Sequence, residues 1–182
     1  DKVAIGNGMI DKYHFKFNHY QEFLNVLDGD QGVIMIGAHV GNWEIGTPFF
    51  NDYSKKMNVV MYDAEHQKIK EILKRNGQQQ PYKIIPVNLA HIFKITEALD
   101  HKEYVCFQGD RYLNADKLLT CKFMGHEACF PIGPFLLASR MKVPVVFYFA
   151  MREAKQTYHF HFILAEKVSG SKEKRAEQLL LE

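Results

Sequence analysis

Residues 32–44 read GVIMIGAHVGNWE, a short apolar run between two glycines that is followed by a polar turn. An apolar run of this length, rich in β-branched residues and bounded by glycine, predicts a strand that is buried on both faces. Asn42 is a favourable N-terminal capping residue, so a helix is expected to begin at about Trp43. The stretch therefore predicts a buried strand, a tight polar elbow and a helix in succession.

The same alternation of patterns continues on both sides of this stretch. Further strands are expected over 57–62, 82–87, 103–108, 143–151 and 157–165, and helices over 20–27, 65–76, 90–100 and 133–140. Such alternation favours an α/β fold with a mixed, largely parallel central sheet flanked by helices. We find no repeat or linker, so residues 1–182 are expected to form a single domain. The run 171–182 is charged and helix-like without a stop signal, and we expect the domain to continue beyond one or both ends.

Composition excludes several classes of protein. Hydrophobic residues make up 47% of the chain and charged residues 24%, as in ordinary globular proteins. The net charge of +2, without a basic tract or zinc-finger spacing, argues against a nucleic-acid partner. Cys106, Cys121 and Cys129 form no disulfide pattern and are expected to be buried, reduced thiols. The apolar run 143–151 is too short to span a membrane, so the chain is expected to be soluble or peripheral.

The elbow carries two residues suited to general base catalysis. His39 follows the buried strand, and Glu44 falls in the first turn of the expected helix. The two side chains can meet across the turn, where the carboxylate would hold one ring nitrogen and raise the basicity of the other. The alternative is that Glu44 only complements the helix dipole and that His39 is an ordinary loop histidine.

The elbow also resembles a known family. The pattern His-x-x-x-x-Glu in GAHVGNWEIG, residues 37–46, is similar to the first motif of the lysophospholipid acyltransferase superfamily, and its wording resembles the late acyltransferases of lipid A biosynthesis. Further blocks follow in the family order from about Gly32 to Phe149: QGDR at 108–111, FMG at 123–125, FPIGP at 130–134, LASR at 137–140 and VPV at 143–145. The second block departs from the usual Asp-Gln-Asp.

The resemblance implies a glycerolipid acyltransferase-like fold and an enzyme. The implied reaction moves a fatty acyl group from the thioester of acyl carrier protein or coenzyme A to a hydroxyl of a lipid acceptor, a lipid A precursor or a related membrane lipid. His39 is the implied general base and Glu44 the acid that orients it. No cofactor is implied. A thioester hydrolase using the same pair and a non-catalytic lipid-binding domain are the alternatives.

The resemblance also implies where the protein works and what it contacts. It implies a membrane surface at the cytoplasmic face of the bacterial inner membrane, where the protein is peripheral or anchored by segments outside this sequence. Lys68, Lys70, Lys74 and Arg75 lie on the helix expected over 65–76 and offer a basic face to an acidic carrier protein. A solvated helix face is the alternative explanation for these four residues.

Five further residues are candidates for substrate binding. Arg111 matches a family position that binds anionic groups, a task for which a planar guanidinium is suited; the alternative is a salt bridge with Asp110 or Asp116. Gly133, at the start of a short helix, offers backbone N–H groups to an oxyanion. The remaining candidates are Asn42 in the elbow, Glu127 as a second carboxylate beside the third block, and Arg140 as an anion contact.

Metal binding is not expected. Cys121, His126 and Cys129 are close in sequence, and His159 and His161 share one face of a predicted strand. Neither spacing matches a standard zinc site.

Overall fold

The structure of the protein is a computed structural model. It describes residues 1, 4–5, 8–50, 55–62, 82–88, 90–112 and 118–165, and for residues 47–50 it describes the backbone only. The helix predicted over 65–76, with its basic residues, and the run 171–182 lie outside the described residues.

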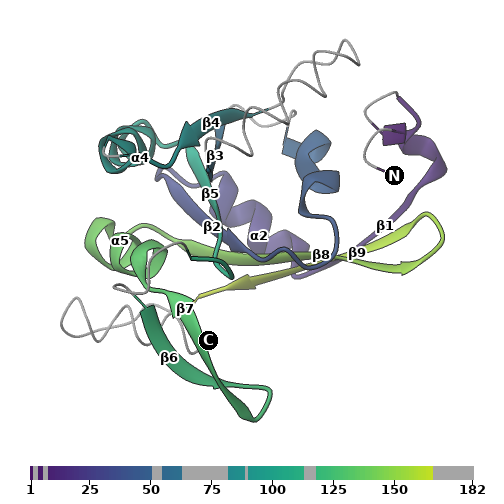
Figure 1. The fold of residues 1–182 in the computed structure, drawn as a ribbon. Helices are drawn as coiled ribbons and strands as arrows, with labels where there is room; N and C mark the ends of the chain where they lie inside the picture. Colours follow the sequence, from purple (N-terminus) through teal and green to yellow (C-terminus); the bar gives the residue numbers. More distant parts are fainter. Residues whose placement is uncertain are drawn as a thin grey trace.

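Seven strands form one sheet in the order β1-β9-β8-β2-β5-β3-β4 (Figure 1). Neighbouring strands are parallel except β8 and β9, which form an antiparallel hairpin. The predicted α/β fold with a mixed, largely parallel sheet flanked by helices is therefore confirmed. A separate two-stranded sheet pairs β6 with β7. The elements are η1 (Ile10–Lys12), β1 (His14–Asn18), α2 (Tyr20–Leu27), β2 (Val33–Gly37), η2 (Trp43–Phe50), β3 (Met57–Met61), β4 (Lys83–Pro86), α4 (His91–Asp100), β5 (Tyr104–Gln108), β6 (Leu118–Phe123), β7 (His126–Pro131), α5 (Gly133–Met141), β8 (Val145–Ala154) and β9 (Thr157–Leu164).

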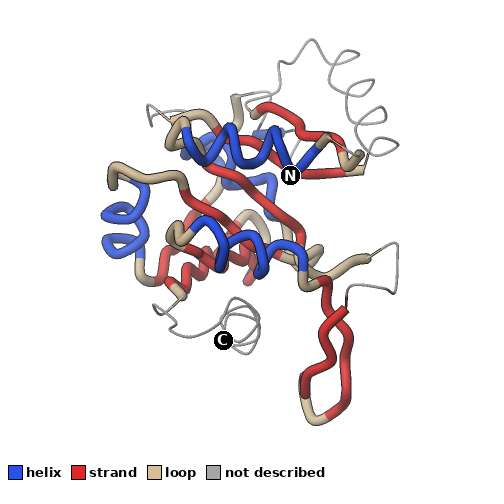
Figure 2. Tube along the Cα trace, turned by 90° about the vertical axis from the view of Figure 1, so that its left-hand side faces the viewer, coloured by secondary structure: helices blue, strands red, loops and turns tan. Residues whose placement is uncertain are grey.

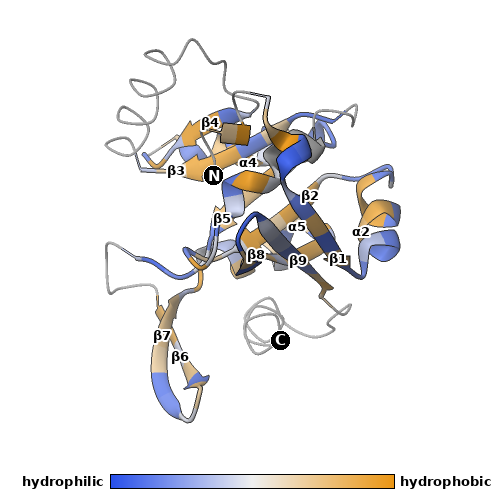
Figure 3. Cartoon of the chain, turned by 90° about the vertical axis from the view of Figure 1, so that its right-hand side faces the viewer, coloured by the Kyte–Doolittle hydropathy of each residue, from blue (hydrophilic) through white to orange (hydrophobic). Residues whose placement is uncertain are grey.

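Strand β2 lies at the centre of the sheet and is buried along its whole length. Because side chains alternate along a strand, Val33 and Met35 enter the core on the α2 side, while Ile34 and Ile36 enter the core on the side of α4 and α5. Figure 3 shows hydrophobic residues gathered on the central strands. Each fully buried aliphatic side chain contributes about 1.5–3 kcal/mol. One core on each face of the sheet thus holds β2 in place, and β2 in turn positions the start of the elbow.

The strand and helix pattern predicted from the sequence agrees with most of the structure. The helix at 20–27 and the strands at 33–37, 104–108, 145–154 and 157–164 are present with ends shifted by at most a few residues from the predicted ranges. The segment that begins at Trp43 is a 3-10 helix, η2. Two features were not predicted. These are the edge strand β1, which pairs with β9, and the hairpin formed by β6 and β7.

The three cysteines are free, as expected, but they are not all buried. Cys106 lies in the core, where burial raises the pKa of its thiol to about 12. Cys121 is half-buried on β6, and Cys129 is exposed on β7, where its sulfur lies 3.4 Å from the Thr120 hydroxyl. The prediction of buried thiols is therefore confirmed for Cys106 and wrong for Cys121 and Cys129, because the unpredicted hairpin carries these two away from the core.

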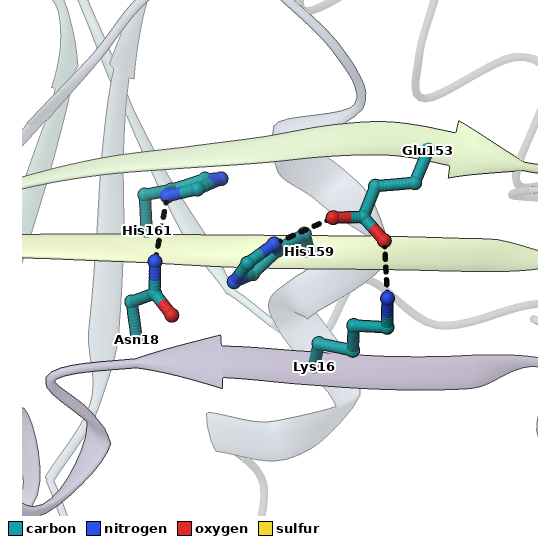
Figure 4. A network of polar contacts seen from close by, with 5 residues as sticks. All are labelled: Lys16, Asn18, Glu153, His159 and His161. Carbon is teal, nitrogen blue, oxygen red and sulfur yellow. Dashed lines mark hydrogen bonds and ion pairs between the residues drawn. The ribbon is translucent and has the colours of Figure 1, made fainter.

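A polar cluster lies on the outer part of the sheet, where β1, β9 and β8 meet (Figure 4). Glu153 accepts hydrogen bonds from Lys16 at 2.6 Å and from Nδ1 of His159 at 2.7 Å. The His159 and His161 rings lie 4.1 Å apart, centroid to centroid, and the Asn18 amide donates to Nδ1 of His161 at 3.2 Å. That last bond requires a neutral His161 ring with an unprotonated Nδ1.

We expect this cluster to make the stability of the fold depend on pH. Desolvation and the neighbouring His159 lower the pKa of His161 below its ordinary value of 6.5, although Glu153 opposes the shift. The unfolded chain therefore takes up the proton first as the pH falls through 6.5, so stability present at higher pH is lost below it. Melting temperatures from pH 8 to pH 5 should fall more steeply for the wild type than for His161→Gln. The difference between the proteins at pH 8 gives the pH-independent cost, and parallel curves over the whole range would contradict the prediction.

Candidate active site

The elbow after β2 is fastened to strand β8. Gly41 forms a bridge with Ala150, and the N–H of Asn42 donates to the Ala150 carbonyl at 2.9 Å. Gly41 adopts a φ of +70°, and a Cβ at this position would lie 2.0 Å from the Ala150 carbonyl oxygen. Only glycine satisfies both the left-handed backbone and the close approach. The Asn42 carbonyl accepts from the N–H of Ile45 at 3.1 Å, which begins η2.

The register of β2 and β5 brings His39 against Asp110. These strands are parallel neighbours with Gly37 opposite Gln108, and the N–H of Gly109 donates to the Gly37 carbonyl at 2.8 Å. His39 and Asp110 each lie two residues beyond that pair. Nδ1 of His39 lies 2.9 Å from Oδ1 of Asp110, and the backbone N–H of His39 donates to Oδ2 at 3.1 Å. Both carboxylate oxygens therefore hold the histidine, one through its ring and one through its backbone.

This contact determines which ring nitrogen is available for chemistry. Burial disfavours the charged form of Asp110, but the hydrogen bonds from the His39 ring and backbone outweigh it, so the pKa of Asp110 lies below its ordinary value. An ionised carboxylate only accepts, so Nδ1 of His39 must carry its proton. In the neutral ring, Nε2 is then the unprotonated nitrogen. Each side chain is 28% exposed, which leaves the ring accessible to a substrate.

Glu44 lies in the first turn of η2 and is held by Tyr82. The Tyr82 hydroxyl donates to Oε1 of Glu44 at 2.9 Å, and the Trp43 ring lies 6.1 Å from the Tyr82 ring. Burial raises the pKa of Tyr82, and the charge of Glu44 and the hydrogen bond to it raise it further. Tyr82 therefore remains a neutral donor at physiological pH. It keeps one carboxylate oxygen of Glu44 in place.

A cavity of about 460 Å³ unites these residues. Its polar lining includes His39, Glu44, His91, Gln108 and Arg111, and apolar side chains supply most of its wall. This size lies in the range of ordinary small-molecule sites. Among the lining residues are Val59, Met61, Ile92, Phe107, Gln108, Pro131, Gly133, Pro134 and Leu137, from β3, α4, β5, β7 and α5. The cavity combines a basic nitrogen, a cation and an apolar surface.

The cavity gathers some of the predicted site residues and not others. Arg111 and Gly133 line it together with His39 and Glu44. Asn42 shapes the elbow through its backbone bonds. Glu127 is exposed on β7, opposite Lys122 in the hairpin, and Arg140 is exposed in the last turn of α5. Neither Glu127 nor Arg140 is among the described residues that line the cavity.

Three residues of the site were not singled out from the sequence as site residues. Asp110 and Tyr82 hold His39 and Glu44. Gln108 lines the cavity, and its Nε2 donates to the Tyr148 hydroxyl at 3.4 Å. Its Oε1 is buried and has no hydrogen-bond partner within the described part of the chain. The sequence carried one signal for Asp110. It lies two residues after the strand that ends at Gln108, as His39 lies two residues after the strand that ends at Gly37.

Across the described ranges, no three His, Cys, Asp or Glu side chains are grouped to hold a metal ion, and no helix is long and apolar enough to cross a membrane. A search of curated proteins gave no match. The family described as bacterial lipid A biosynthesis acyltransferase matches residues 6–179. Because the match covers nearly all of the sequence, the chain belongs to the bacterial lipid A biosynthesis acyltransferase family and is an acyltransferase.

Proposed function

We propose that this enzyme transfers a fatty acyl group from the thioester of acyl carrier protein or coenzyme A to a hydroxyl of a lipid A precursor or a related membrane lipid. The observation that carries the proposal is the contact between His39 and Asp110 beside a largely apolar cavity. The acceptor would be met at the cytoplasmic face of the bacterial inner membrane, with the protein peripheral or anchored by other segments.

In the proposed reaction, His39 acts first as a general base. Nε2 takes the proton of the acceptor hydroxyl while its oxygen attacks the thioester carbonyl. The tetrahedral intermediate collapses, the carbon–sulfur bond breaks, and the thiolate takes the proton from the imidazolium. The products are an ester and a free thiol, and no covalent acyl-enzyme is needed. Asp110 holds Nδ1–H throughout, so the imidazolium forms beside a carboxylate.

Glu44 assists as a second negative charge on the cavity wall. We expect Glu44→Gln to lower kcat about tenfold, because a unit charge in a half-buried cavity stabilises an imidazolium by about 1–2 kcal/mol. The amide oxygen of Gln can still accept from the Tyr82 hydroxyl, so the melting temperature should be nearly unchanged. Initial rates with saturating substrates measure the effect. A wild-type kcat in the folded variant would remove Glu44 from the mechanism.

Arg111 is proposed to bind an anionic group of the donor or acceptor at the cavity. Replacing Arg111 by Ala should raise KM for that substrate about tenfold or more, because a hydrogen bond to a charged group is worth about 1.5–3 kcal/mol. Arg111→Lys is the matched control. It keeps the charge but loses the planar fork, so its KM should fall between the two. Unchanged KM values for both substrates in Arg111→Ala would exclude this role.

Gln108 and the start of α5 are proposed to contact the reacting groups. The buried Oε1 of Gln108 requires a hydrogen-bond partner, and a substrate N–H or O–H would supply one. Gly133 is the first residue of α5 and lines the cavity, where its backbone N–H can be offered to an oxyanion.

The deciding experiment uses lipid mass spectrometry of cells with and without the gene. The lipid that loses one acyl chain identifies the acceptor, and the mass of that chain identifies the acyl group. Purified enzyme with acyl carrier protein thioester and the extracted acceptor should then restore it. Release of free fatty acid at the same rate without any acceptor would support a thioester hydrolase instead.

A further inference from the structure

The hairpin of β6 and β7 stands apart from the main sheet. Figures 1 and 2 show it projecting from the body of the domain, and its strands pair only with each other within the described structure. Two-stranded hairpins gain little stability by themselves in water. A hairpin of this kind therefore requires a reason for its extension beyond the core.

The tip of this hairpin, residues 123–125, is apolar and exposed. Phe123 is 55% exposed and Met124 is 86% exposed, while a Cβ added at Gly125 would meet nothing within 4 Å. The Phe123 ring makes an edge contact with Phe130, at 5.8 Å between centroids, which holds it on one face of the hairpin. Single exposed apolar residues are ordinary, but two adjacent ones at the end of a projecting hairpin form a small apolar surface.

Met124 also occupies a backbone position that is unfavourable for it. Phe123 pairs with His126, and the two turn residues between them both have positive φ, 52° for Met124 and 84° for Gly125. Tight hairpin turns of this kind favour Asn, Asp or Gly at both positions. A methionine here costs backbone strain and exposes a large apolar side chain. Within the described residues, Met124 remains 86% exposed, so burial offsets neither cost.

The base of the hairpin is the rim of the active-site cavity. Strand β7 ends at Pro131, and Pro131, Gly133 and Pro134 line the cavity. Strand β7 therefore joins the tip to the cavity, and any surface that the tip contacts lies near the cavity. If the acceptor is a membrane lipid, that surface is a lipid bilayer.

We infer that the hairpin tip is a membrane-contact element, in which Phe123 and Met124 insert into the bilayer beside the cavity entrance. The inference rests on the proposed function, which supplies the lipid acceptor. Lys122 flanks the tip, where its cationic side chain can meet anionic headgroups, and Glu127 lies opposite Lys122. Insertion gives the exposed Phe123 and Met124 an apolar surrounding, with the flanking charges left at the level of the headgroups.

Vesicle sedimentation tests the inference directly. The full chain is mixed with vesicles of phosphatidylethanolamine and phosphatidylglycerol, and the bound fraction is measured for the wild type and for Phe123→Ser/Met124→Ser. Burial of one such side chain changes a partition coefficient by about tenfold or more, so the double variant should bind at least about tenfold more weakly. Phe93→Ser is the matched control, because Phe93 is 76% exposed on α4 and should change binding less than about twofold by the same reasoning.

Fluorescence locates the tip itself. Met124→Trp adds an indole at the turn, and its emission, taken as the difference from the wild type with Trp43 alone, should shift to the blue on vesicles and be quenched by brominated acyl chains. The inference is overturned if the wild type does not bind vesicles, if the double variant binds as the wild type does, or if Phe93→Ser weakens binding equally. An unshifted emission from the added indole would also overturn it.

Activity assays separate this inference from the proposed function. The double variant should transfer acyl groups at the wild-type rate to acceptor dispersed in detergent micelles, and at least about tenfold more slowly to acceptor in vesicles. If the wild type transfers no acyl group to acceptor in micelles or in vesicles, the proposed function fails. The vesicle-binding assay still tests the role of the hairpin in that case. Loss of acyl carrier protein binding with vesicle binding intact would assign the tip to a protein partner and overturn the inference.

Discussion

Replacing His39 by Ala should reduce kcat about 10²–10⁴-fold while leaving the fold intact. An acceptor hydroxyl is a poor nucleophile at neutral pH until a base accepts its proton, and His39 is the cavity histidine whose Nδ1 is held by a carboxylate. The expected loss corresponds to about 3–5 kcal/mol of the activation barrier. Since the His39 side chain is 28% exposed and outside both cores, its removal should cost little stability.

The measurement is transfer of a radiolabelled acyl group from acyl carrier protein to the lipid acceptor, with melting temperatures recorded in parallel. His39→Gln is a useful companion, because the amide can still bond to Asp110 but does not accept a proton at neutral pH. Both variants should be inactive to a similar degree. A stable His39→Ala protein that turns over at the wild-type rate would end the proposed mechanism.

The fold could be predicted where one segment carries its own signal. GVIMIG at 32–37 is apolar enough to be read as a strand covered on both faces, and β2 is buried on both faces. Strand β1 and the hairpin of β6 and β7 lack such a signal. The residues His14–Asn18 become a strand because β9, far away in the sequence, supplies parallel hydrogen-bonding partners. Pairing between distant segments is set by tertiary structure, and local patterns do not encode it.

The site could be predicted in part for the same reason. His39, Glu44 and Arg111 lie around one cavity, as expected of groups that follow the carboxyl ends of the neighbouring parallel strands β2 and β5. Gly133 reaches the same cavity from the start of α5, which follows β7 of the separate two-stranded sheet. The contact of Asp110 with His39 depends on the register that places Gly37 opposite Gln108. The family motif predicts Glu44, five residues from His39, as a site residue. Asp110 is distant in sequence, and only the strand register brings its Oδ1 to 2.9 Å from Nδ1 of His39.

Replacing Asp110 by Asn should lower kcat about 10²-fold or more, which is a larger loss than for Glu44→Gln. Asp110 accepts from two donors, the ring Nδ1–H and the backbone N–H of His39. An asparagine has one acceptor oxygen and one NH2 group, so it satisfies one of these donors and opposes the other. If the oxygen stays on the backbone N–H, the NH2 group faces Nδ1 and favours the tautomer with the proton on Nε2. That tautomer is unable to accept a proton from the acceptor hydroxyl.

A comparison of kcat with the melting temperature separates this orienting role from a loss of stability. Asp110→Ala is the matched control. It removes the carboxylate without imposing a tautomer, so it should lower kcat less than Asp110→Asn does. A lower melting temperature with a wild-type kcat in both folded variants would mean that Asp110 serves the fold rather than the histidine.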